Sequence, residues 1–566
     1  MLENKRGKNN SDYPILLSLA QKTSQRCDLC RLLANRFEGW GDETEIHLLN
    51  SRSRLRICAA PGTGEARKDI QIGFPALPRA GSPAHFDLLR EWLRVCDEDH
   101  KPLRCRLKSK PENLPTRVLD VGDGEDFHFL RLCEPKPGQG IEYIALSHSW
   151  GKLSPEQKST FCTNAANVGA RHVGFDIDKL PQAFKDAIHV TRRLQKRYLW
   201  IDSLCIVQDD ESDWELESRR MEAVFDNAYC TIAATSAKDC TVGFLNTQPT
   251  KQQCIKVPTS SHGQVFICET TDDFDRDVED GILNKRAWVL QERALSCRTI
   301  HFTDSQTYWE CGVGVRCESL THMRNSKALF LGDPDFPESV RWRRYEDQVS
   351  LFQFLCSRYS ALGLSVRTDR AVAISGLQER VAGVFASVAR YGVFEKYLHR
   401  SLLWQRSARA ELEPISYQNN SVPSWSWMAY HGKIEYMHIP FGDVEWVQDI
   451  RFMERTLTAE VQIFYNWDWL AFNPNGGAVR KMGSCTSIQL IYDEEQSADS
   501  EDRGPVLYFV ALGREPEPDQ FTFGFDPRCY GLIVTPRQDL PDTYKRIGVG
   551  YFPKSRLHIQ GQGCIT

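Results

Sequence analysis

The strongest constraint on the fold is an alternation of apolar runs and amphipathic segments between residues 143 and 235. Tyr198–Val207 is a nearly continuous apolar run, which is typical of a strand buried on both faces of a parallel sheet. Leu180–Gln195 has the apolar spacing of a helix, Trp214–Ala228 predicts a second helix, and Cys230–Thr235 predicts a further strand. Strands that alternate with helices in this order predict a doubly wound α/β unit.

The chain has 566 residues, enough for two to four compact units. We expect a leader with helical segments over residues 1–135, which includes a predicted helix at 13–36, and the α/β unit over 136–310. A mostly helical region follows at 311–430. Short apolar runs separated by turn residues predict a β-rich unit over 431–566.

Composition and charge narrow the class of protein. The hydrophobic fraction is 41% and the formal net charge is −5, so the chain is globular and has no electrostatic case for nucleic acid as a partner. Neither a secretory signal nor an apolar stretch of roughly 20 residues is visible. The 19 cysteines are odd in number and scattered, which favours free thiols in a reducing compartment. We therefore expect a soluble protein without a transmembrane segment, cytoplasmic or nuclear.

Polar side chains follow two of the predicted strands. Ser147, His148 and Trp150 lie at the end of the first strand, and Asp202 lies within the second apolar run, before an acidic segment. Because ligands bind beyond the carboxyl ends of the strands in open α/β sheets, these side chains are candidate ligand-binding residues.

The helix after the second apolar run adds Trp214 and Glu217. Their i, i+3 spacing places an indole and a carboxylate on one side of a helix, where they would hold a planar ligand that carries a ribose. The alternative is structural: Trp214 caps the core, Glu217 pairs with Arg220, and His148 is an ordinary buried histidine. No phosphate-binding loop and no nucleophile elbow supports a different chemistry.

A third cluster lies on the predicted helix at 286–295. Arg286, Trp288, Gln291 and Glu292 fall within two turns, and Trp288 and Glu292 share a face. We predict that these residues are structural and that an Arg–Glu pairing joins this helix to the sheet.

The leader contains a possible zinc site. Cys27 and Cys30 have the spacing of a zinc knuckle, and His100 and Cys105 supply two more ligands, with Cys96 as an alternative. The competing interpretation is that these cysteines are buried thiols.

Several stretches resemble the fungal heterokaryon-incompatibility (HET) domain, in the order and spacing of that family. These are Tyr143-Ile-Ala-Leu-Ser-His-Ser-Trp-Gly151, Leu199-Trp-Ile-Asp-Ser-Leu-Cys-Ile-Val-Gln-Asp-Asp210, Asp213-Trp-Glu-Leu-Glu-Ser-Arg-Arg-Met221, Thr231-Ile-Ala-Ala234 and Arg286-Ala-Trp-Val-Leu-Gln-Glu-Arg293. Flanking pieces such as Leu114-Pro-Thr-Arg117 and Thr368–Gly376 extend the likeness to about residues 20–430. His148-Ser149 and Phe225 depart from the usual family residues.

The resemblance implies a role in vegetative incompatibility, in which contact between unlike fungal individuals triggers programmed cell death. It also implies a TIR-like fold and homotypic association of the HET domain. Because some TIR domains hydrolyse NAD, the resemblance makes Glu217 the candidate catalytic residue, one position closer to Trp214 than in the usual TIR pattern, with Ser147 and Asp202 lining the pocket. A signalling module without enzymatic activity, an NAD hydrolase, and a divergent member with another role in defence all remain open.

Overall fold

The computed structural model describes most of the chain from residue 77 onward. Two short strands before that point are also described, whereas the predicted helix at 13–36 lies outside the described residues. The described ranges are 55–59, 71–72, 77–100, 114–122, 128–136, 138–245, 254–258, 264–269, 272–320, 322–323, 336–408, 410–417, 422–464, 480–482, 486–494, 507–517 and 526–566.

The largest sheet has ten strands among the described residues. Its order is β14 (His322–Met323), β13 (Gly314–Cys317), β12 (Thr307–Cys311), β11 (Arg298–Phe302), β8 (Cys230–Ala233), β5 (Tyr143–Ser147), β7 (Tyr198–Trp200), β3 (Val118–Asp120), β4 (Phe129–Cys133) and β6 (Phe175–Asp176). The adjacent strands β11, β8, β5 and β7 are parallel, and the outer strands join antiparallel. The α/β prediction is confirmed, but the sheet is mixed.

Helices cover both faces of the parallel strands. On one face, α3 (Pro83–Glu98) and α6 (Gln182–Arg193) pack against Ile144 and Leu146 of β5. On the other face, α8 (Glu211–Asn227) and α9 (Ala287–Leu295) pack against Tyr143 and Ala145. Successive residues of a strand point to opposite faces. Because helices cover both faces, every side chain of β5 is buried, and Tyr143–Leu146 is a continuous apolar run.

The prediction of one strand over Tyr198–Val207 is wrong. β7 ends at Trp200, and Asp202–Cys205 form a short helix, α7. The backbone N–H of Cys205 donates to the Ile201 carbonyl at 2.8 Å, so Cys205 lies on a helical turn rather than in a strand. The segment is buried in either conformation, and periodicity does not separate a short buried helix from a strand.

The capping residues account for where α8 and α3 begin. The Asp210 carboxylate accepts the backbone N–H groups of Ser212 and Asp213, so α8 starts at Glu211, three residues before the predicted start. Ser82 caps α3 by accepting the N–H of His85. Both caps satisfy N–H groups that have no partner within their helix.

A small sheet of four strands is separate from the large one. Its order is β2 (Gln71–Ile72), β1 (Leu55–Ala59), β10 (Gln264–Glu269) and β9 (Cys254–Pro258). The helical region that was expected further along the chain contains α10 (Tyr345–Ser360), α11 (Ser375–Val384) and α12 (Leu398–Leu402). Side chains of α10 and α11 belong to the same hydrophobic core as one face of the large sheet.

The C-terminal residues form a closed barrel of five strands, and this confirms the β-rich prediction. The strands are β23 (Leu457–Phe464), β26 (Tyr508–Arg514), β27 (Arg528–Pro536), β28 (Thr543–Pro553) and β29 (Leu557–Ile565). The ring closes because β27 pairs with both β26 and β28, while β29 joins β28 to β23. A β-carbon at Gly531 would lie 2.0 Å from the Val510 carbonyl oxygen, so this position needs glycine.

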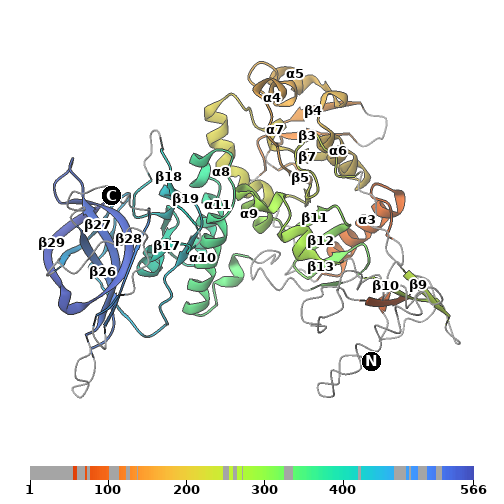
Figure 1. Ribbon diagram of the computed structural model, residues 1–566. Coiled ribbons are helices and arrows are strands. Elements are labelled where there is room, and N and C mark those ends of the chain that lie inside the picture. Colours follow the sequence, from red (N-terminus) through yellow and green to blue (C-terminus); the bar gives the residue numbers. More distant parts are fainter. Residues whose placement is uncertain are drawn as a thin grey trace, which may run out of the picture.

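Figure 1 shows the large sheet toward one end of the molecule and the barrel at the other, with α8, α10 and α11 between them. Among the residues that the structure describes, no helix has both the length and the apolar character required to span a membrane.

Candidate functional site

A pocket of about 250 Å³ lies beyond the carboxyl ends of β5 and β7. Its walls come from the loop after β5, the start of α7, one side of α8, the start of α9, and residues 363–369 before α11. The lining includes the polar or aromatic side chains His148, Trp150, Lys158, Asp202, Gln208, Trp214, Ser218, Arg286, Trp288, Glu292 and Asp369. Its position is the one that open α/β sheets use for ligands.

The structure brings four of the five predicted ligand-binding residues to this pocket. They are His148, Trp150, Asp202 and Trp214. The fifth, Ser147, is the last residue of β5 and is buried. Its hydroxyl donates a hydrogen bond to the carboxylate of Glu292, so Ser147 reaches the pocket through that residue.

Glu292 is the most perturbed acid of the pocket. Burial raises its pKa to about 7, although the Ser147 hydroxyl and the nearby Arg286 guanidinium both favour the charged form. A carboxyl group with a pKa near neutrality is suited to exchange a proton or to balance a developing positive charge. The sequence predicts a structural role for Glu292, and in the structure its carboxylate accepts a hydrogen bond from Ser147 and lines the pocket.

The loop after β5 is held by hydrogen bonds to the pocket floor. The Trp150 indole N–H donates to Asp202 at 2.7 Å, and Arg286 donates to the His148 carbonyl oxygen at 2.6 Å. Burial lowers the pKa of His148, and its ring nitrogen lies 3.8 Å from the Asp202 carboxylate. His148 is therefore neutral, and the Trp150 indole is the direct hydrogen-bond partner of Asp202.

The other residues of the α9 cluster divide between two faces. Trp288 lines the pocket and donates a hydrogen bond to Asp369. Gln291 points the other way and accepts the backbone N–H of Leu377 on α11 at 3.0 Å. The expected Arg–Glu pairing is present through Arg293, which bonds the carboxylate of Glu310 on β12 at 2.8 Å.

Glu217 is not among the residues that line the pocket. Trp214 and Ser218, four residues apart on α8, face it instead. Glu217 is 1% exposed, accepts a hydrogen bond from Thr116, and has an Arg220 nitrogen at 3.9 Å. Burial raises its pKa. Thr116 lies on the segment before β3, and Arg220 lies one turn further along α8.

Sequence reasoning did not assign Lys158 or the residues of 363–369 to the site. Lys158 places its ammonium 5.6 Å from the centre of the Trp150 ring, and burial raises the pKa of Asp369. These residues line the pocket only because the fold brings distant segments of the chain together. Among the stretches that resemble the HET family, Thr368–Gly376 includes a residue of this part of the pocket, Asp369.

A second cluster lies away from the pocket. Ligand atoms of Cys96, His100 and Cys311 all fall within 4.8 Å of one another. Cys96 and His100 were predicted zinc ligands, whereas Cys311 was not, because 211 residues separate it from His100 in the chain. The predicted ligands Cys27, Cys30 and Cys105 lie outside the described residues.

Comparison with known protein families assigns part of the chain. Residues 143–292 match the family described as Heterokaryon incompatibility protein (HET). No curated protein and no solved structure matched the chain. The matched region begins at the first residue of β5 and ends at Glu292 of α9, so it contains most of the pocket.

Proposed function

We propose that this protein, which carries a HET domain at residues 143–292 and is thereby a heterokaryon incompatibility protein, triggers programmed cell death in nonself recognition when that domain self-associates. The family match carries the proposal. In it, residues 136–310 are the effector, and the regions 1–135, 311–430 and 431–566 sense a protein partner or restrain the effector.

The experiment is inducible expression of the full-length chain in a fungal host, with cell viability as the readout. The full chain is used because β3, β4 and β12 complete the sheet that carries the pocket. We expect death that depends on expression level, and light scattering of the purified protein should show dimers or larger species as its concentration rises. Leu216 is 53% exposed on α8, and Leu216→Glu tests whether this surface takes part. Viable cells at high expression, or a toxic protein that stays monomeric, would contradict the proposal.

A second candidate function, NAD hydrolysis, is favoured by the composition of the pocket. Three indoles, those of Trp150, Trp214 and Trp288, line it together with the acidic side chains of Asp202, Glu292 and Asp369. Indoles stack on planar rings, and a carboxylate stabilises positive charge as it develops on a ribosyl carbon. In this reaction the bond between ribose and nicotinamide breaks, water supplies the new hydroxyl group, and nicotinamide leaves.

Two carboxylates compete for the catalytic role. The likeness to TIR domains favours Glu217, whereas pocket geometry favours Glu292, which faces the cavity and has a pKa of about 7. Both replacements by glutamine keep the side-chain shape, so Glu292→Gln and Glu217→Gln form a matched pair.

The assay follows nicotinamide release from NAD by purified full-length protein. If Glu292 is catalytic, Glu292→Gln lowers the rate by about 100-fold or more, the range expected for removal of an acid–base group, while Glu217→Gln changes it little. The reverse result identifies Glu217. Wild-type protein that is assembled and releases no nicotinamide excludes this second function and leaves the first one standing.

A further inference from the structure

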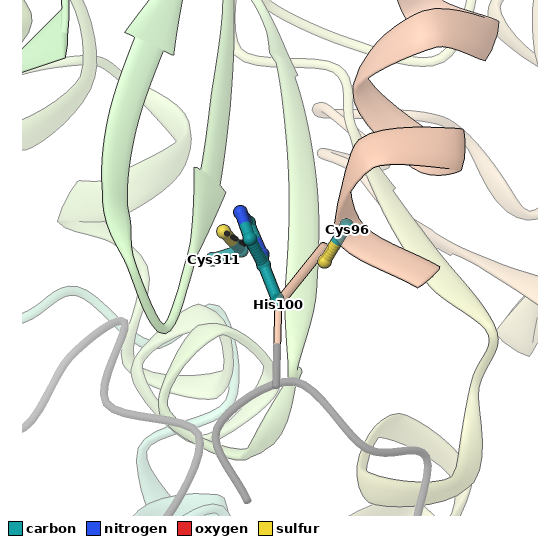
Figure 2. Close-up of side chains that lie close together, drawn as sticks. All are labelled: Cys96, His100 and Cys311. Carbon is teal, nitrogen blue, oxygen red and sulfur yellow. Dashed lines mark hydrogen bonds between the residues drawn. The ribbon is translucent and has the colours of Figure 1, made fainter. Parts of the chain in front are cut away.

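Three nitrogen and sulfur side chains meet where the end of α3 faces the turn after β12 (Figure 2). Cys96 lies in the last turn of α3, His100 follows just beyond the helix, and Cys311 is the final residue of β12. The Nδ1 atom of His100 lies 3.7 Å from the Sγ atom of Cys311.

The backbone and the core hold this arrangement in place. The N–H of His100 donates to the Val95 carbonyl oxygen at 3.3 Å, a bond that closes the C-terminal end of α3. This closure holds His100 next to the last turn of the helix, where its ring lies beside Cys96. Trp92 of α3 contacts Trp309 of β12 with ring centres 6.5 Å apart. The helix is therefore packed on the strand one turn before the three side chains converge.

The separations suit a tetrahedral zinc ion. Zinc lies about 2.3 Å from thiolate sulfur and about 2.0 Å from imidazole nitrogen, so ligand atoms in a tetrahedron are roughly 3.5–3.8 Å apart. The distance between His100 and Cys311 already falls in this range. The upper limit of 4.8 Å for the whole group requires shifts of about an ångström, which side-chain rotation supplies.

Charge supports the same assignment. Cys96 is 1% exposed and Cys311 is 3% exposed, and cysteines that ligate zinc at such depth do so as thiolates whose charge must be balanced. A divalent cation balances both of them. The buried Arg298, which also pairs with Asp97 at 2.6 Å, lies close enough to Cys96 for mutual electrostatic stabilisation.

We propose that Cys96, His100 and Cys311 bind one Zn²⁺ ion, which fastens α3 to β12 of the large sheet. Two thiolates and one imidazole are ligands that zinc favours, and the fourth position is left for water or another ligand. All three residues lie outside the matched HET region, so the ion secures flanking elements to the sheet that carries the pocket. This inference does not depend on the proposed function.

The first measurement is the zinc content of full-length protein purified without added metal, together with X-ray absorption at the zinc edge. We expect one zinc per chain, with two sulfur neighbours and the remainder nitrogen or oxygen. Cys96→Ser and Cys311→Ser should each weaken binding by at least about 100-fold, more than loss of a partner outside the ligand sphere costs. Cys240→Ser is the control, because Cys240 is equally buried and does not belong to the cluster.

His100→Cys keeps the proposal testable if the serine variants fail to fold. This variant should retain one zinc and show three sulfur neighbours. Protein that holds no zinc and gives no thiolate-to-metal charge-transfer band with Co²⁺ overturns the proposal. Zinc that remains stoichiometric in folded Cys96→Ser and Cys311→Ser, or a sulfur count that His100→Cys does not raise, overturns it as well.

Discussion

Two buried glutamates of the α/β region illustrate how neighbours decide what a residue does. Glu217 faces Thr116 and Arg220, whereas Glu292 faces Ser147 and the pocket. Burial raises the pKa of both carboxyl groups. Glu217 does not line the pocket, so of these two carboxyl groups only Glu292 lies where a ligand in the pocket can reach it.

The raised pKa of Glu292 makes the stability of the wild-type protein depend on pH. An unfolded glutamate titrates near 4.5 and the folded one near 7, so the folded state holds the proton more tightly and loses stability as pH rises through this window. We expect Glu292→Gln to remove that loss, which amounts to about 3 kcal/mol above pH 7 for a shift of this size. Chemical unfolding at pH 5 and pH 8 measures it. Equal slopes with pH in both proteins would contradict the assignment.

Arg286 should set where Glu292 titrates. Its positive charge favours the ionised carboxylate, so Arg286→Met is expected to move the pKa of Glu292 further upward. The apparent midpoint of any Glu292-dependent signal, such as stability or nicotinamide release, then rises by about one pH unit. The double variant Arg286→Met/Glu292→Gln is the control and should show no such midpoint. An unchanged midpoint in the single variant would show that Arg286 does not act on Glu292.

At the scale of elements, the helices that frame the pocket are positioned by their ends and by ion pairs. Asp210 caps α8, and Arg380 of α11 pairs with Glu222 and Asp226 of α8 at 2.8 and 2.9 Å. Buried Arg293 ties α9 to β12 through Glu310, whose pKa it holds far below its usual range. The pocket walls therefore keep their spacing through contacts behind the lining side chains.

Loss of the α8 cap should weaken the element and leave the pocket chemistry intact. Asp210→Ala removes the acceptor for two backbone N–H groups, and we expect it to cost about 1 kcal/mol of unfolding free energy. The exposed Glu215 on the same helix provides the control Glu215→Ala, which should change stability by less than about 0.5 kcal/mol. Urea unfolding compares them. A cap variant as stable as the control would show that the cap contributes nothing.

At the scale of the whole molecule, the large sheet, the downstream helices and the barrel are joined through shared cores. One core includes side chains of β5, α9, α10 and α11, and another includes α12 and the barrel strands. Arg546 of β28 is 0% exposed, pairs with Asp493 at 3.0 Å, and donates to the Leu402 and Trp404 carbonyl oxygens. One guanidinium thus connects the barrel to the segment that contains α12.

Removal of this link should uncouple the barrel. Arg546→Met leaves Asp493 buried without its cation, and breaking a buried pair in this way costs about 3–5 kcal/mol. We expect calorimetry to show a separate, earlier unfolding transition for the barrel. In the double variant Arg546→Met/Asp493→Leu the unpaired charge is gone, and stability should recover in part. A single transition at the wild-type temperature in Arg546→Met would contradict this coupling.

The sequence by itself determined the features that depend on neighbours in the chain. Apolar spacing predicted a helix at Leu180–Gln195 and a strand at Cys230–Thr235, and the structure has α6 at Gln182–Arg193 and β8 at Cys230–Ala233. Such predictions succeed because burial of one helical face or of a whole strand produces a regular spacing of apolar residues. The order of the family-like motifs identified the HET region. The polar residues that follow the first and second predicted strands indicated where the pocket lies. The Asp210 cap at the start of α8 is likewise a contact between neighbours in the chain.

Tertiary structure decided everything that required distant segments to meet. Only the packing of α3 on β12 brings Cys311 beside Cys96 and His100, and only the rotation of α8 turns Glu217 away from the pocket while α9 turns Glu292 toward it. The barrel likewise closes through the pairings of β23 with β29 and with β26, which lie far from it in the sequence. Periodicity records whether a residue is buried and leaves open against which partner, since that choice depends on how the whole core packs.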